Sequence, residues 1–165
     1  MNTPWQYIAD ALRDELQEYG ALLGLYDQQQ ERIFQRDPDG VLIIAQTIES
    51  LATRLQQVRK RREDLVRTFA FEHGADPEST LRALLSHVAS EARPLVEALV
   101  DEINHLIRRT RRRARQNRLL LARAIEVRQQ TLQALKPETF SQTYSPAGKV
   151  QLGSPAFAGG YQAAG

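Results

Sequence analysis

The sequence contains no cysteine, so it can form neither a disulfide nor a thiolate metal site. Its three histidines, His73, His87 and His105, are widely scattered, which argues against a zinc cluster. The longest purely apolar run, residues 41–45, is too short to cross a bilayer, and no basic segment followed by an apolar stretch opens the chain. We therefore expect neither a signal peptide nor a membrane span, which is compatible with a cytoplasmic location.

Motifs of catalysis are also missing. The chain has no glycine-rich phosphate loop, no His-Glu-x-x-His and no serine in a nucleophile turn. Acidic residues such as Glu15, Glu18, Asp101 and Glu102 are interpreted as solvated helix-surface carboxylates, and the Glu-x-x-His repeat of di-iron bundles does not occur. We expect no catalytic residue, no metal ligand and no cofactor, and we predict that the protein is not an enzyme.

Helix signals, by contrast, are abundant. Thr3 can cap a helix, Pro4 suits its first position and Gln6 completes a capping box. Apolar residues then recur in steps of three and four up to Ile33, which predicts a helix over residues 4–35. The segment Asp37-Pro38-Asp39-Gly40 predicts a turn that reverses the chain and caps the next helix.

The second helix has the most regular pattern, a seam of alternating three- and four-residue steps that is typical of a coiled coil. Its residues are Val41, Ile44, Ile48, Leu51, Leu55, Val58, Arg62, Leu65 and Phe69. Because a buried unpaired charge is costly, we expect the Arg62 stem to lie on the seam while its guanidinium reaches water or a carboxylate.

Beyond this seam, Gly74 should end the second helix, and Asp76-Pro77 should open a short helix at one end of the bundle. The apolar side of that short helix comprises Leu81, Leu84, Leu85 and Val88.

The last helix should begin near residue 90 or 91 and continue to Leu135, because only Pro94, in its first turn, precedes Pro137. The predicted apolar stripe comprises Leu95, Leu99, Ile103, Leu106, Leu120, Leu121, Ile125, Leu132 and Leu135, with a weak middle at Thr110 and Ala114. Since this helix is longer than its partners, we expect its C-terminal part to leave an apolar face uncovered, as interaction sites do.

These patterns predict an all-α fold: an antiparallel bundle of three long helices with coiled-coil character and one short extra helix. From Pro137 onward the composition shifts to Ser, Thr, Pro, Gly and Ala, which predicts a flexible C-terminal tail. We expect a helical bundle domain over residues 1–136 and a tail over residues 137–165.

Arginines are concentrated in the last helix, at Arg108, Arg109, Arg111, Arg112, Arg113, Arg115 and Arg118. Together with the basic segment 59–62 they could neutralise nucleic-acid phosphates. However, the run is interpreted as going all round the helix, no aromatic residue interleaves for base stacking, and the net charge is only +2. The favoured interpretation is a solvated basic stretch paired with carboxylates of neighbouring helices.

The end of the last helix and the segment after it carry a family resemblance. Asn117 is followed by the leucine pair Leu119 and Leu120, the helix closes with Leu132 and Leu135, and Tyr144, Pro146 and Gly148 form a Tyr-x-Pro-x-Gly element. With Trp5 near the start and the basic Arg59–Arg62 segment late in the second helix, this arrangement resembles the FlgN family over roughly residues 4–148.

The resemblance implies a cytoplasmic bacterial chaperone. Such a chaperone binds hook-associated flagellar proteins through their C-terminal helices, prevents their premature association and delivers them to the flagellar type III export gate. The residues expected to contact partners are Asn117, Leu120, Leu121, Ala124, Val127, Leu132, Leu135 and Tyr144, with Tyr144 assigned to the export machinery. Two alternatives stay open: a basic helical nucleic-acid-binding protein, and a structural coiled-coil module that oligomerises through the second helix.

Overall fold

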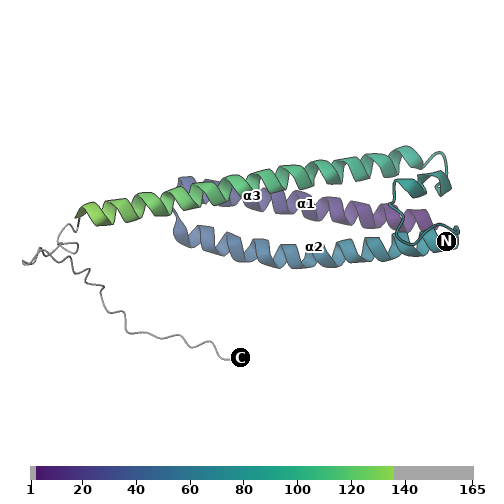
Figure 1. Cartoon of the computed structure of the whole chain (residues 1–165), viewed down its shortest axis with the longest axis horizontal. Coiled ribbons are helices and arrows are strands. Elements are labelled where there is room, and N and C mark those ends of the chain that lie inside the picture. Colours follow the sequence, from purple (N-terminus) through teal and green to yellow (C-terminus); the bar gives the residue numbers. More distant parts are fainter. Residues whose placement is uncertain (1–2, 136–165) are drawn as a thin grey trace, which may run out of the picture. The chain divides into compact units, whose positions relative to one another are not determined.

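The structure is a computed structural model in which residues 3–135 are described. It contains three long helices, α1 (Pro4–Phe34), α2 (Pro38–Glu72) and α3 (Arg93–Leu135), and the short 3₁₀ helix η1 (Ala83–His87) (Figure 1). Over residues 3–135 there is no strand, which confirms the all-α prediction. The predicted tail and Tyr144 lie outside the described residues.

The chain divides into two units, Met1–Arg123 and Ala124–Gly165, and each is considered by itself. The first unit holds α1, α2, η1 and most of α3. The described part of the second is the last segment of α3, residues 124–135. The domain boundary predicted at residue 136 falls at the end of the described residues and stays a prediction.

Local chemistry sets the hairpin of α1 and α2, as predicted. The backbone N–H of Thr3 donates to Gln6 Oε1 over 2.6 Å at the start of α1. Asp37 caps α2, because its carboxylate accepts the backbone N–H of Gly40 over 2.9 Å. Gly74 lies just beyond α2 with a φ of 66°, the left-handed conformation that glycine adopts most easily.

Contacts between the helices within residues 3–123 show which helices are parallel and which are antiparallel. Glu15 meets Arg62 and Glu18 meets Arg54, so α1 and α2 are antiparallel. Arg113 contacts Asp27, near the end of α1, while the residues around Val96 share a core with the start of α1. Therefore α3 runs parallel to α1 and opposite to α2 (Figure 1).

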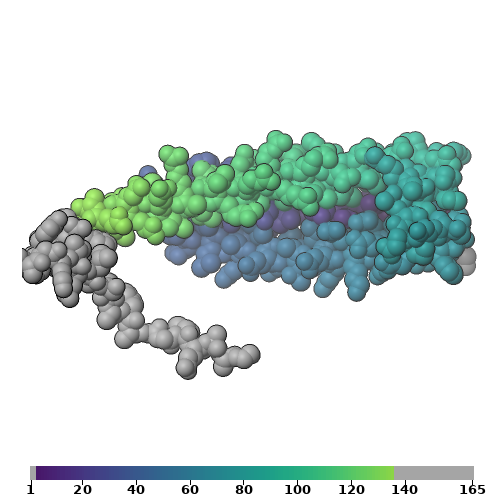
Figure 2. All heavy atoms as spheres, viewed as in Figure 1, coloured from purple at the N-terminus to yellow at the C-terminus, as the bar shows by residue number. Residues whose placement is uncertain are grey.

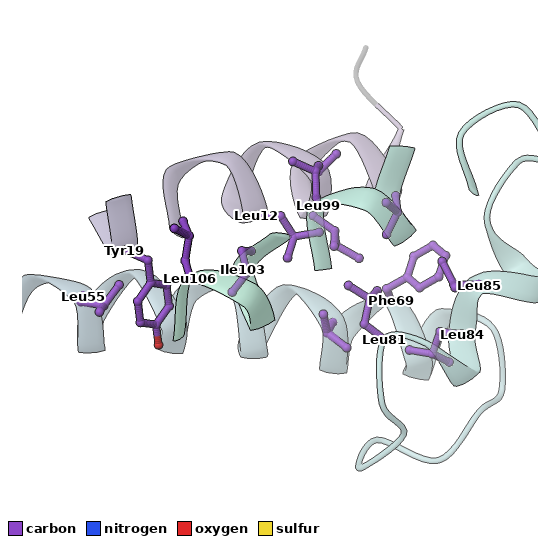
Figure 3. Close-up of a cluster of buried hydrophobic side chains, with 14 of the residues drawn as sticks. Leu12, Tyr19, Leu55, Phe69, Leu81, Leu84, Leu85, Leu99, Ile103 and Leu106 are labelled. Carbon is purple, nitrogen blue, oxygen red and sulfur yellow. The ribbon is translucent and has the colours of Figure 1, made fainter. Parts of the chain in front are cut away.

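The hydrophobic core lies between the three helices. Ile8 and Leu12 of α1 are almost fully buried, and they belong to one cluster with residues of α2 and α3 (Figure 3). Its α2 and α3 members include Ile48, Leu51, Leu55, Phe69, Val96, Leu99, Ile103 and Leu106. Because the α2 seam packs inside the chain here, its central leucines are not exposed for the oligomerisation considered above.

The segment between α2 and α3 closes the bundle end at which α1 begins (Figure 2). Leu81, Leu84, Leu85 and Val88 are all buried there, and the first three surround Phe69 (Figure 3). The predicted start of a helix at Asp76-Pro77 is wrong, because residues 76–82 form turns and irregular structure and the only helix of this segment is the five-residue 3₁₀ helix η1. Side chains satisfy the backbone locally instead: Asp76 accepts the N–H of Glu78 over 2.9 Å.

In two helices, the residues that are buried differ at one position from the predicted apolar stripe. In α3 the buried residue of the first turn is Val96, whereas Leu95 is exposed. In the last turns of α2, Val66 is buried with Phe69 and Ala70, whereas the predicted Leu65 is only partly buried. In α3, Val96 shares the seven-residue spacing of the buried Ile103 and Thr110, so Val96 and not Leu95 lies on the packed side of the helix.

Candidate functional site

The last segment of α3, residues 124–135, carries exposed apolar side chains. Val127 is 53% exposed, Leu132 60% and Leu135 73%, and Ile125 is similarly open. Large apolar residues of a helix are normally buried against a neighbouring element. Over the described residues, nothing covers these side chains, which agrees with the uncovered apolar face expected from the sequence.

Four of the six polar residues of the same segment are gathered on one side. Glu126, Gln129, Gln130 and Gln133 are spaced by three, one and three residues, which places them on a single helix face. The remaining positions form the broad opposite side, here called the apolar face, which includes Ala124, Ile125, Val127, Leu132 and Leu135 together with Arg128 and Thr131. The segment is therefore amphipathic, with its apolar face open.

The apolar face continues, by register, the side of α3 that is buried in the first unit. Val96, Ile103, Thr110 and Asn117 are buried and follow one another every seven residues. The next members of this series are Ala124 and Thr131. In the sequence register of α3, the buried seven-residue series therefore extends to Ala124 and Thr131.

The predicted contact residues fall into three groups. Ala124, Val127, Leu132 and Leu135 lie on the apolar face and are exposed. Leu120 and Leu121, in the first unit, are half-buried. Asn117 is only 1% exposed, so its side chain is enclosed within the first unit. Tyr144 lies outside the described residues.

Asn117 links α3 to α1 from inside the bundle. Its Nδ2 donates to the backbone carbonyl of Tyr26 over 2.8 Å and to Gln29 Oε1 over 3.0 Å. Its Oδ1 has no hydrogen-bond partner among the described residues, and neither does the buried hydroxyl of Thr110. A polar residue at a packed helix position specifies register at some cost in stability, and this geometry gives Asn117 that role.

We expect Asn117→Ala to lower the free energy of unfolding by about 2 kcal/mol, because it removes one buried and one partly buried hydrogen bond and leaves Gln29 Oε1 without its donor. Urea denaturation followed by circular dichroism measures the change. The exposed neighbour Gln116→Ala is the matched control and should change stability by less than about 0.5 kcal/mol. Equal effects of the two substitutions would contradict the structural role of Asn117.

Glu15 is buried, contrary to its interpretation as a solvated surface carboxylate. It is 2% exposed, and its Oε2 accepts a hydrogen bond from Arg62 Nε over 2.5 Å. This contact confirms that the guanidinium on the α2 seam reaches a carboxylate. The sequence held the signal, because Glu15 follows Leu12 by three residues and precedes Tyr19 by four, which is core spacing.

Tyr19 lies beside this ion pair. Burial raises its pKa above the ordinary value of 10.0, and the positive charge of Arg59 partly opposes that shift. The folded protein therefore retains the phenol proton at a pH where the unfolded chain has lost it, so stability should fall as pH rises above about 10.

We expect Tyr19→Phe to remove part of this alkaline loss. The measurement is urea unfolding of the wild type and the variant at pH 9 and at pH 11, two values that bracket the ordinary tyrosine pKa of about 10. The gap in stability between the two pH values should be smaller in the variant, and an equal loss in both proteins would contradict the burial effect.

The arginines of α3 are solvated, as the favoured interpretation predicted, but most of them are not paired with carboxylates. Of the seven between residues 108 and 118, only Arg113 has a carboxylate within 4.0 Å, that of Asp27 at 2.7 Å, over residues 3–135. The prediction that these arginines are distributed all round the helix is also wrong for five of the seven. Five of the arginines are spaced by three, one, three and three residues on one exposed face: Arg108, Arg111, Arg112, Arg115 and Arg118.

Two of the three histidines meet at the closed end of the bundle. The ring of His73 lies 4.2 Å from that of Phe69 and 5.2 Å from that of His87, centroid to centroid. No group of three or more potential metal ligands occurs within residues 3–135. No helix in this part of the chain is long and apolar enough to cross a membrane.

The fold and this surface define an all-α bundle whose last helix carries an uncovered amphipathic segment. The family model of the FlgN protein matches residues 1–151, and the chain therefore belongs to the FlgN family. This is a family of chaperones for flagellar type III protein export. No curated protein and no solved structure matches the chain.

Proposed function

We propose that this protein binds hook-associated flagellar proteins in the bacterial cytoplasm through the apolar face of residues 124–135. The client, in this proposal, contributes amphipathic helices from its C-terminal segment. Covering those helices prevents their premature association, and the complex is then delivered to the flagellar export gate.

The observation that supports this proposal is that the apolar face of residues 124–135 is exposed, although residues at the same seven-residue spacing earlier in α3 are buried. An amphipathic helix in a groove recognises its partner through anchors at helical spacing. Val127, Leu132 and Leu135 supply such anchors, and the small Ala124 allows a partner helix to approach closely. Client helices would thus take the place that α1 and α2 hold beside the earlier part of α3.

Two further contacts belong to the proposal. Leu120 and Leu121, in the first unit, are half-buried, and we propose them as additional contacts of the client. Tyr144, outside the described residues, is proposed to contact the export machinery, because an amphipathic ring suits a shallow pocket. Asn117 acts in this scheme by holding α3 in register on α1.

Co-purification with the C-terminal segment of a hook-filament junction protein from the same organism tests the proposed function. A stable complex of defined stoichiometry is expected in size-exclusion chromatography. The absence of a complex with every hook-associated protein of that organism would contradict the proposal.

A further inference from the structure

The exposed basic face of α3, defined as Arg108, Arg111, Arg112, Arg115 and Arg118, is not used by the proposed client contact. All five side chains are exposed and lie in the first unit. Their spacing places them on the side of α3 away from the core residues Leu106, Thr110 and Asn117. At a rise of about 1.5 Å per residue the face is roughly 15 Å long.

Other arginines of the first unit already have acidic partners. Arg61 of α2 is paired with Asp14 at 3.8 Å, Arg59 with Glu63 at 3.6 Å, and Arg82 with Asp101 at 2.6 Å. None of the five arginines of the basic face has a carboxylate within 4.0 Å over residues 3–135, although acidic residues are nearly as numerous as basic ones in the sequence. The charge of this face is therefore not compensated by the described part of the chain.

The basic segment of α2 lies near this face, although its Arg59, Arg61 and Arg62 are each paired with a carboxylate. Arg59 of α2 and Arg111 of α3 both lie close enough to Tyr19 for their charges to act on its pKa, which burial raises. Their shared neighbour places the two basic segments near one another. The concentration of like charge here is unfavourable in the free protein, so an anionic partner would relieve it.

The chemistry of the face favours carboxylates. Every cation in it is arginine, whose planar guanidinium binds carboxylate or phosphate through two parallel hydrogen bonds. Spacing by three and four residues on one helix matches carboxylates with the same spacing on another helix that lies alongside it. A stretch of about three helical turns would cover the face.

Nucleic acid fits the face less well. Helix α3 contains no phenylalanine, tyrosine or tryptophan on which a base could stack. Glu97 and Asp101 stand on the same side of the helix, directly before the arginines, and would repel a phosphate backbone that continued along it. Pairing of this face with the same side of α3 in a second copy also fits poorly, because those two carboxylates cannot compensate five arginines.

We propose that the basic face of α3 binds an acidic α-helix of a second partner protein. The partner presents glutamates or aspartates at alternating three- and four-residue spacing over about three turns. This contact is separate from the client contact on residues 124–135, so it stands or falls independently of the proposed function.

The test uses the full-length protein and a synthetic helical peptide with glutamates at that spacing, and its glutamine counterpart serves as the uncharged probe. Fluorescence anisotropy at low and physiological salt measures binding. The triple variant Arg111→Gln, Arg112→Gln, Arg115→Gln should weaken binding at least about tenfold, the sum of three exposed charge-assisted contacts. The control triple Arg13→Gln, Arg54→Gln, Arg67→Gln removes the same charge from α1 and α2 and should change binding less than about twofold.

Each outcome decides the proposal. Selective weakening by the α3 variant, with an unchanged melting curve, supports it. No binding of the glutamate peptide, or equal weakening by both triple variants, would overturn it. Tighter binding of single-stranded RNA, duplex DNA or anionic lipid vesicles than of the peptide would overturn the assignment to protein carboxylates.

Discussion

We expect Arg62→Ala to lower the free energy of unfolding by about 3–5 kcal/mol, the largest effect of any single polar substitution in the first unit. The Arg62 guanidinium is the only hydrogen-bond partner of the Glu15 carboxylate within the described residues, and Glu15 is 2% exposed. Removal of the guanidinium leaves a buried negative charge without compensation. Urea denaturation followed by circular dichroism measures the change.

Arg61→Ala is the matched control for this prediction. Arg61 is adjacent in sequence, but its side chain is 70% exposed and lies 3.8 Å from Asp14. An exposed pair of this kind contributes less than about 1 kcal/mol. The double variant Glu15→Leu, Arg62→Leu should regain most of the stability lost in Arg62→Ala, because replacement of both partners by apolar residues is often neutral. Equal losses of unfolding free energy in Arg61→Ala and Arg62→Ala would contradict the prediction, because they would show that burial of the Glu15–Arg62 pair does not affect stability.

The second large effect concerns the client. The double variant Val127→Asp, Leu132→Asp should weaken binding of the hook-associated C-terminal segment by at least about 100-fold. Each exposed side chain would be buried in the complex, and burial of such a side chain is worth about 1.5–3 kcal/mol, or roughly ten- to a hundredfold in affinity. Titration calorimetry of the purified components measures the dissociation constant.

Its control places the same charges on the other side of the helix. Gln130→Asp and Gln133→Asp lie on the polar face of residues 124–135 and should leave the dissociation constant within about threefold, because they remain in solvent. Both double variants should melt like the wild type, since these positions are exposed. If the two pairs of substitutions weaken binding equally, charge and not the apolar face accounts for the loss.

The sequence was sufficient for the parts of this fold that local chemistry decides. The start of α1 at Pro4, the Asp37 cap and the stop at Gly74 each depend on one or two side chains and their own backbone, so they could be predicted without knowledge of the packing. For Arg62 the prediction was that its guanidinium reaches water or a carboxylate, because a buried unpaired charge is costly, and the structure supplies the carboxylate of Glu15.

What could not be predicted depends on how the helices meet. Val96 is buried and Leu95 exposed because the rotation of α3 against the bundle selects one of two adjacent apolar residues. Asn117 was assigned to partner contacts from the family resemblance, and only the position of Tyr26 and Gln29 shows that its amide is enclosed. The uncompensated charge of the basic face could be identified only from the structure, which shows which arginines have acidic partners.

Hydrogen exchange of the backbone amides of α3, with and without the client segment, tests the central claim most directly. The account predicts strong additional protection at residues 124–135 in the complex, because a covered helix opens less often than an exposed one. Protection confined to α1 and α2, with residues 124–135 exchanging as fast as in the free protein, would contradict the claim that this segment is the client-binding surface.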